Sequence, residues 1–243
     1  MDTLPVFAKE PVAQLADVIS KRLGDNLMSL TLVGSVLTED FNPKHSDINS
    51  VLVVRQNTPD LLNFLAEIGP RMGRKRLAAP LLMWPEYIQR SCDVFAVEWL
   101  DFQWRHQTLL GKDPFSELTF TKANVRLQCE REFKSALVRL RQGYIRSAGK
   151  PAVIAQLITA AARELLAYLR ATLWLYDIER PITAAPIFEQ IGHLCELPAE
   201  ALAQRHARRF ERPHPSKDAM QSAFAETYRA VEKLAEMTDK LEV

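Results

Sequence analysis

The spacing of apolar residues differs between the two halves of the chain. From about residue 10 to residue 120 it switches repeatedly between the helical period and the short apolar runs of strands. Pro11 at a first-turn position and Gly24 as a stop mark the first helix. The pattern predicts helices over 11–23, 61–68 and 86–90, and strands over 27–33, 48–54, 81–84 and 93–100.

After residue 121 only helical patterns remain. The predicted helices cover 124–147, 151–176, 186–195, 198–210 and 217–240. Residues 151–176 are apolar on almost every face, which indicates a central buried helix. We therefore expect an α/β (α+β) domain with a small mixed sheet over residues 1–120, followed by an all-α helical bundle domain over residues 121–243.

Composition and charge exclude several classes of protein. The 243 residues are 47% apolar and 25% charged, which is ordinary for a globular protein, and a formal charge of +1 removes the simplest argument for a nucleic-acid binder. The three cysteines include no CxxC pair, so we expect neither a disulfide framework nor a structural zinc site. No apolar run of about 18 residues occurs, and the start lacks a secretory pattern. A cytoplasmic protein without a membrane span is expected.

The glycines exclude the common nucleotide-binding motifs. No two of the eight glycines are separated by a single residue, so the GxGxxG of dinucleotide-binding folds and kinases cannot occur. The stretch from Gly69 to Lys75 is one residue too short for a P-loop and lacks the following Ser or Thr.

The sharpest chemical motif follows the first predicted strand. Gly34 and Ser35 end that strand, and after eleven further residues Asp47 and Asn49 lead into the next one. A Gly-Ser turn lets backbone amides approach a phosphate closely. Residues 47 and 49 point to one face of a strand, because side chains alternate with period two. Two oxygen-bearing side chains beside a phosphate-binding turn suit a Mg²⁺–triphosphate complex.

This motif resembles the signature of the nucleotidyltransferase superfamily of DNA polymerase beta, a Gly-Ser turn followed by Asp-x-Asp/Glu on the next strand. The stretch 85–101, with Val-Glu-Trp-Leu-Asp at its end, is similar to a group of bacterial predicted nucleotidyltransferases. His106, residues 110–115 and the helix around 136–144 extend the similarity, so it covers most of residues 27–176.

The resemblance implies a role for each matching residue. Gly34 and Ser35 would hold the β- and γ-phosphates of a nucleoside triphosphate (NTP). Asp47, Asn49 and Glu98 would coordinate Mg²⁺ or Mn²⁺, with Asp47 and Glu98 as the catalytic carboxylates. If Glu98 is structural, Asp101 is the next candidate for the third carboxylate. The implied reaction is transfer of a nucleoside monophosphate from the NTP to an unknown hydroxyl acceptor, with release of pyrophosphate.

Position 49 departs from the signature, because it holds Asn where an active enzyme usually has Asp or Glu. A neutral amide should weaken Mg²⁺ binding, so two interpretations stay open: an unusual transferase, or a catalytically silent module that binds a nucleotide or a partner. An RNA-associated toxin–antitoxin component is a third. It would use the basic cluster of Arg205, Arg208, Arg209, Arg212 and Lys217, where Arg209 and His214 also fit an R-x4-H ribonuclease spacing interrupted by Pro213. The apolar helix 151–176 would suit a dimer as well as a monomer core.

Overall fold

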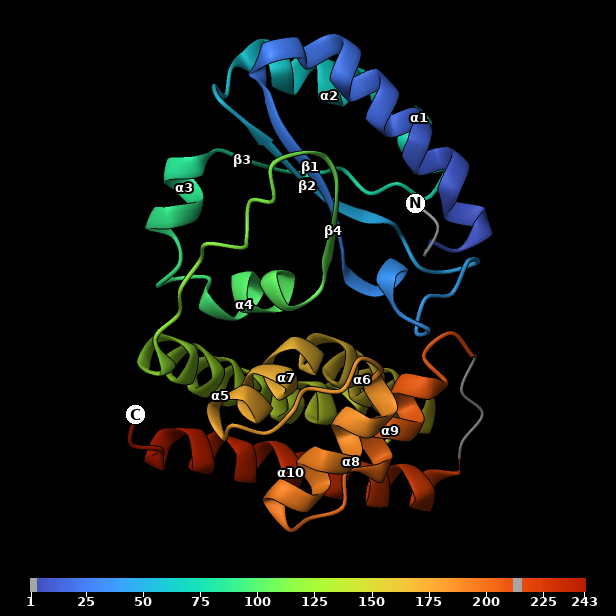
Figure 1. The fold of residues 1–243 in the computed structure, drawn as a ribbon. Coiled ribbons are helices and arrows are strands. Elements are labelled where there is room, and N and C mark those ends of the chain that lie inside the picture. The colour runs from blue at the N-terminus through green and yellow to red at the C-terminus, as the bar shows by residue number, and fades with distance from the viewer. Residues whose placement is uncertain (1–3, 212–215) are drawn as a thin grey trace. The chain divides into compact units, whose positions relative to one another are not determined.

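A computed structural model describes residues 4–211 and 216–243 of the chain (Figure 1). The chain divides into two compact units. The first, called the sheet unit below, comprises the described residues up to Cys92 together with Trp99–Thr119. The second, the helical unit, comprises Asp93–Glu98 and the described residues from Phe120 onward. The predicted division into two domains, residues 1–120 and 121–243, stays a prediction.

The sheet unit contains one mixed sheet within the described residues, with strand order β3-β2-β1-β4. The central strand β1 pairs antiparallel with both β2 and β4, and β3 is parallel to β2. The strands are β1 (Leu27–Val33), β2 (Asn49–Val54), β3 (Leu81–Met83) and β4 (His106–Gly111). The helices of this part of the chain are α1 (Val6–Leu23), α2 (Pro59–Arg74), α3 (Pro85–Arg90) and α4 (Ala96–Trp104), and the short 3₁₀ turns are η1 (Gly24–Asn26) and η2 (Gly34–Leu37).

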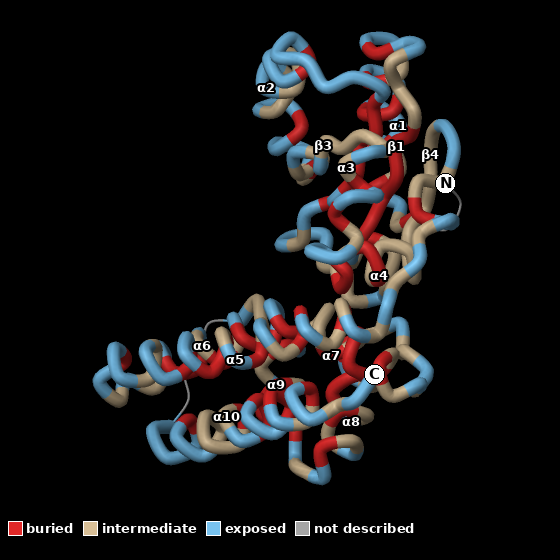
Figure 2. Tube along the Cα trace, turned by 90° about the vertical axis from the view of Figure 1, so that its left-hand side faces the viewer, coloured by how far each residue is buried: buried red, intermediate tan, exposed pale blue. Residues whose placement is uncertain are grey.

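The two faces of this sheet have different neighbours. Leu30 and Leu32 of β1 pack with α1 and α2 in one apolar core, and Figure 1 shows both helices on that side of the sheet. Ser29 and Thr31, which alternate with these leucines along β1, point to the opposite face, because side chains alternate along a strand. The central position of β1 explains the buried run along it in Figure 2.

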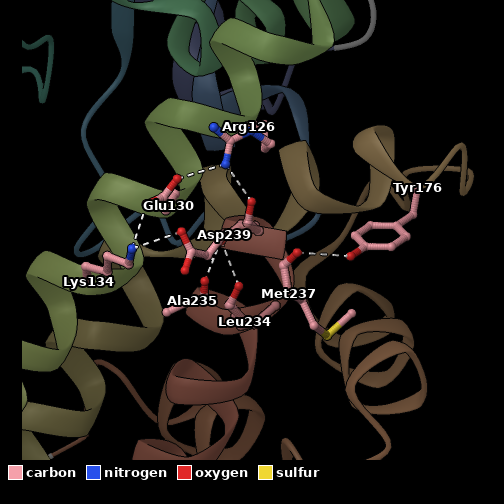
Figure 3. Close-up of polar contacts among 9 residues, drawn as sticks. Arg126, Glu130, Lys134, Tyr176, Leu234, Ala235, Met237 and Asp239 are labelled. Carbon is pink, nitrogen blue, oxygen red and sulfur yellow. Dashed lines mark hydrogen bonds and ion pairs between the residues drawn. The ribbon is translucent and has the colours of Figure 1, made fainter. Parts of the chain in front are cut away.

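The helical unit is built on two long helices, α5 and α10, with shorter helices packed on them. Their bounds are α5 (Lys122–Ser147), α6 (Pro151–Glu164), α7 (Leu166–Leu175), α8 (Ala184–Cys195), α9 (Glu200–Ala207) and α10 (Lys217–Lys240). Polar contacts tie the end of α10 to the start of α5 (Figure 3). Arg126 donates to the Thr238 carbonyl at 2.8 Å, and Lys134 binds Glu130 at 2.6 Å and Asp239 at 3.2 Å.

This architecture confirms the predicted fold class, a mixed sheet with helices followed by a helical part. Several elements differ from their predictions. The strand expected over 93–100 is wrong, because helix α4 begins at Ala96. The strand β4 was not predicted. The single helix expected over 151–176 is two helices that meet at Leu165. The first helix begins at Val6 rather than residue 11, so Pro11 lies inside it.

Among residues 4–211 and 216–243, no single helix is long and apolar enough to cross a membrane. The consecutive helices α6 and α7 satisfy the length and composition criteria only as a pair, with a bend of 46° between them. Buried core helices of globular proteins satisfy the same criteria.

Candidate nucleotide site

The candidate site begins where β1 ends. Gly34 follows Val33 with a φ of +80°, a conformation that favours glycine, and the chain then forms the turn η2. The turn is closed by Thr38, whose backbone N–H and hydroxyl both donate to the Ser35 carbonyl, at 2.9 and 3.1 Å. Gly34 is exposed and Ser35 is half-buried, so an external group can reach the start of this turn.

The strand register places Asn49 beside this turn. Asn49 pairs with Val33 across β1 and β2. A Cβ added to Gly34 would lie 3.4 Å from Asn49 Nδ2, which is van der Waals contact. Asp47 and Asn49 are exposed, whereas Ile48 between them is fully buried. The structure therefore brings Gly34 and Asn49 together at one end of the sheet, and Asp47 lies two residues before Asn49.

Arg76 supplies positive charge to this group and was missed by the sequence reasoning. Its Nη1 lies 4.0 Å from Asp47 Oδ1; the Asp47 side chain is exposed and the Arg76 side chain is half-buried. The loop that carries Arg76 is fixed by Ile48, whose N–H donates to the Arg76 carbonyl at 2.7 Å and whose carbonyl accepts from Ala78 at 3.0 Å. No local motif signals this contact, because it depends on a tertiary loop conformation.

A second cation was also missed, at the far side of the turn. Arg105 donates from Nη2 to the Leu37 carbonyl, the last residue of η2, while its Nε is buried and has no hydrogen-bond partner among the described residues. The next residue, His106, pairs with Val33 across β1 and β4. These positions could have been recognised only if β4 had been predicted.

His106 is held on both ring nitrogens. Nδ1 lies 2.9 Å from the Phe102 carbonyl, and Nε2 lies 2.9 Å from Asp113 Oδ2. Burial alone would raise the pKa of Asp113, but the N–H of Phe115 and the His106 ring outweigh it and hold that pKa below its ordinary value. The His106 ring therefore links the end of α4 to Asp113 in the segment after β4, which is a structural role.

Glu98, the predicted third carboxylate, lies in the first turn of α4 and belongs to the helical unit. It accepts hydrogen bonds from Gln128 Nε2 at 2.6 Å and from the Tyr168 hydroxyl at 3.2 Å. Burial, and next the charge of Glu98, raise the pKa of Tyr168. The alternative, Asp101, also lies on α4, in the part that belongs to the sheet unit. The role of either as a third carboxylate stays a prediction.

The metal-ligating capacity of the described residues is modest. They contain no cluster of three or more His, Cys, Asp or Glu side chains placed to hold a metal ion. Residues 77–83, which run beside β2, include no carboxylate. Asp47 and Asn49 offer one carboxylate and one amide oxygen. This set fits a Mg²⁺ ion that takes its remaining ligands from water and substrate phosphates, the usual arrangement for Mg²⁺.

The basic cluster is partly exposed in the described residues, where Arg208 and Lys217 are exposed and Arg209 is half-buried. Arg205 is half-buried and donates from Nε to Thr159 Oγ1 at 3.1 Å, and Arg209 donates to the His206 carbonyl at 2.9 Å. Arg212 of the basic cluster lies outside the described residues, and so does His214, which with Arg209 forms the ribonuclease spacing. The RNA partner and an oligomeric state both stay predictions.

Comparisons with known proteins give a structural match. No protein-family profile matches the chain, and no curated protein sequence matches it. Among solved structures, it is similar to the spectinomycin adenyltransferase AAD(9) from Enterococcus faecialis, crystallised with ATP and spectinomycin. The TM-score is 0.53 and the identity 9%, over 92% of this chain and 99% of that one. The chain therefore has a nucleotidyltransferase-like fold.

Proposed function

We propose that the chain is a nucleotidyltransferase that binds an NTP with Mg²⁺ and transfers its nucleoside monophosphate to a hydroxyl acceptor. The observation that carries this proposal is the pairing of Val33 with Asn49, which sets the Gly34–Leu37 turn beside the exposed side chains of Asp47 and Asn49. The fold shared with an adenyltransferase supports the same reaction class.

Each residue has a distinct part in the proposed reaction. The turn at Gly34 and Ser35 contacts the β- and γ-phosphates, and the cations Arg76 and Arg105 offset phosphate charge. Asp47 and Asn49 would hold the divalent ion, which when bound neutralises charge on the triphosphate. The acceptor oxygen bonds to the α-phosphorus as the bond to the β-phosphate oxygen breaks. Pyrophosphate leaves, and the hydroxyl proton passes to a carboxylate, for which Glu98 and Asp101 are the candidates.

A second candidate function is a catalytically silent module that binds a nucleotide. Three observations favour it: the neutral Asn49, the Arg76 guanidinium beside Asp47, and the lack of a carboxylate over residues 77–83. In such a module the guanidinium would take over part of the charge compensation that a metal ion provides. Nucleotide binding would then need little Mg²⁺ and release no pyrophosphate.

Calorimetric titration with ATP and GTP, each with and without Mg²⁺ or Mn²⁺, tests nucleotide binding. We expect metal-dependent binding that Asp47→Ala weakens by about tenfold or more, the equivalent of about 1.4 kcal/mol. Asp17→Ala is the matched control, because Asp17 is an exposed carboxylate on α1 whose recorded partner is Lys21. If neither ATP nor GTP binds, both candidate functions are overturned.

Pyrophosphate release distinguishes the two candidates. A transferase releases pyrophosphate when a suitable hydroxyl compound is added, and spectinomycin, the molecule bound by the structural neighbour, is the first acceptor to test. The variant Asn49→Asp should bind Mg²⁺·ATP at least as tightly as the natural chain, because a carboxylate is a stronger Mg²⁺ ligand than an amide. If the nucleotide binds but no pyrophosphate is released with any of a broad panel of sugars, aminocyclitols and nucleosides, the silent module is favoured.

A further inference from the structure

A cavity of about 420 Å³ lies within the sheet unit, at the end of β1 opposite to Gly34. Its floor includes Ser29 of β1, Val53 of β2 and Ile88 of α3, and Cys92 lies at its wall. Lys112 and Glu117, from the segment after β4, stand at its mouth. The volume is in the range of pockets that bind small molecules.

The floor of this cavity carries a polar group with nothing to bond to. Ser29 is only 1% exposed, and its hydroxyl has no hydrogen-bond partner among the described residues. Ser29 pairs with Val53 in the sheet, so both side chains point to the face that the cavity borders. Buried hydroxyls are normally hydrogen-bonded, and an exception on a cavity floor points to a polar group of a bound molecule.

The mouth carries both signs of charge. Lys112 Nζ lies 2.7 Å from Glu117 Oε1, and the two side chains are 77% and 80% exposed. Exposed ion pairs contribute little, because solvent screens them. Opening the pair toward a ligand therefore costs little, and it would present one ammonium and one carboxylate side by side.

We propose that this cavity binds a free amino acid. The α-carboxylate would pair with Lys112 and the α-ammonium with Glu117. The side chain would enter the space above Val53 and Ile88, where the Ser29 hydroxyl meets its polar group. A zwitterion complements an opposed pair of charges better than an ion of either sign. The inference does not depend on the proposed transfer reaction.

Calorimetric titration of the full chain with each standard amino acid except cysteine tests binding directly. At least one free amino acid should bind, and its N-acetyl amide, which lacks both charges, should bind at least about tenfold more weakly. Lys112→Gln should weaken binding to a similar degree, whereas Lys21→Gln should not, because Lys21 is a similarly exposed lysine whose ion pair lies on α1, away from the cavity. Absence of binding by every free amino acid, or equal binding of the amide, would overturn the proposal.

Alkylation of Cys92 locates the bound molecule. Burial raises the pKa of Cys129 to about 12 and that of Cys195 to about 11, so iodoacetamide should react mainly with the half-buried Cys92. The amino acid that binds should slow this reaction about tenfold near saturation. Ser29→Val, which fills the floor and removes the hydroxyl, should abolish the protection, with folding checked by circular dichroism. Binding that leaves the alkylation rate unchanged would place the ligand elsewhere and contradict the assignment.

Discussion

Gly34 combines two constraints in one residue. Its φ of +80° is a conformation that costs an L-residue about 1–2 kcal/mol, and a Cβ there would contact Asn49 Nδ2. We expect Gly34→Ala to lower the free energy of unfolding in urea by about 1–2 kcal/mol and to weaken ATP binding. Gly69→Ala is the control, because Gly69 lies in helix α2 with open space around it, and should stabilise by up to about 1 kcal/mol. Equal effects of the two variants would contradict this account.

Residue-level chemistry in this site was only partly predictable from the sequence. The spacing of Gly34, Asp47 and Asn49 indicated their proximity, because consecutive strands usually pair and side chains alternate along them. Arg76 and Arg105 could not be found in this way. The first depends on a loop fixed by hydrogen bonds to Ile48, and the second on the position of an unpredicted strand.

Among the elements, the segment around α4 shows why short apolar runs mislead. Residues 93–100 resemble a strand because six of the eight are apolar and two of these are valines, yet a run of this length has no decisive period. In the structure Ala96, Val97, Trp99 and Leu100 are buried, which is a helical spacing. The N–H groups in the first turn of a helix have no acceptor within the helix. In α4, the Val97 N–H donates instead to Gln128 Oε1 at 2.8 Å. A residue 31 positions along the chain thus supplies the partner of an N–H group at the start of the helix, which the local sequence pattern does not reveal.

Asp113 contacts His106, the first residue of β4, and the stabilising effect of this contact should depend on pH. The pKa of Asp113 is lower in the folded chain than in the unfolded one, so its stabilising contribution is complete above the ordinary pKa of a carboxyl. It is lost as the pH falls through the lowered value. We expect the natural chain to be more stable than Asp113→Asn in urea unfolding near pH 6, with the difference shrinking toward pH 3. A difference that stays constant over this range would refute the assignment.

For the whole molecule, the fold places weaker demands on the sequence than the chemistry does. The fold is similar to that of a spectinomycin adenyltransferase over 92% of this chain at 9% identity, so largely different residues can build a similar fold. Packing requires apolar residues of suitable size, whereas the reaction requires particular groups at particular places. Under the proposed function, the choice between an active and a silent site would therefore depend on a few positions, for which 47, 49 and 98 are the candidates.

Glu98 allows structural and catalytic roles to be separated in the intact chain. Glu98→Ala leaves Gln128 Nε2 and the Tyr168 hydroxyl without their acceptor, which should cost about 1–3 kcal/mol. Hydrogen exchange should then quicken in α5 and α7 while β1 and β2 stay protected, because stability is lost locally. Glu164→Ala, which removes an exposed pair with Arg139, should change little.

Glu98→Gln completes the comparison, because its amide keeps one acceptor oxygen near Tyr168 but cannot accept a proton from an attacking hydroxyl. The new NH2 group faces Gln128 Nε2, a donor that loses its acceptor, so hydrogen exchange should quicken less than in Glu98→Ala but not stay natural. If Glu98 is only structural, pyrophosphate release should change as little as this exchange does. If Glu98 is the third carboxylate, pyrophosphate release should fall by about 100-fold or more, the usual contribution of a general base, while exchange changes only slightly. A large loss of turnover with most of the protection kept would therefore assign the catalytic role, which loss of both could not do.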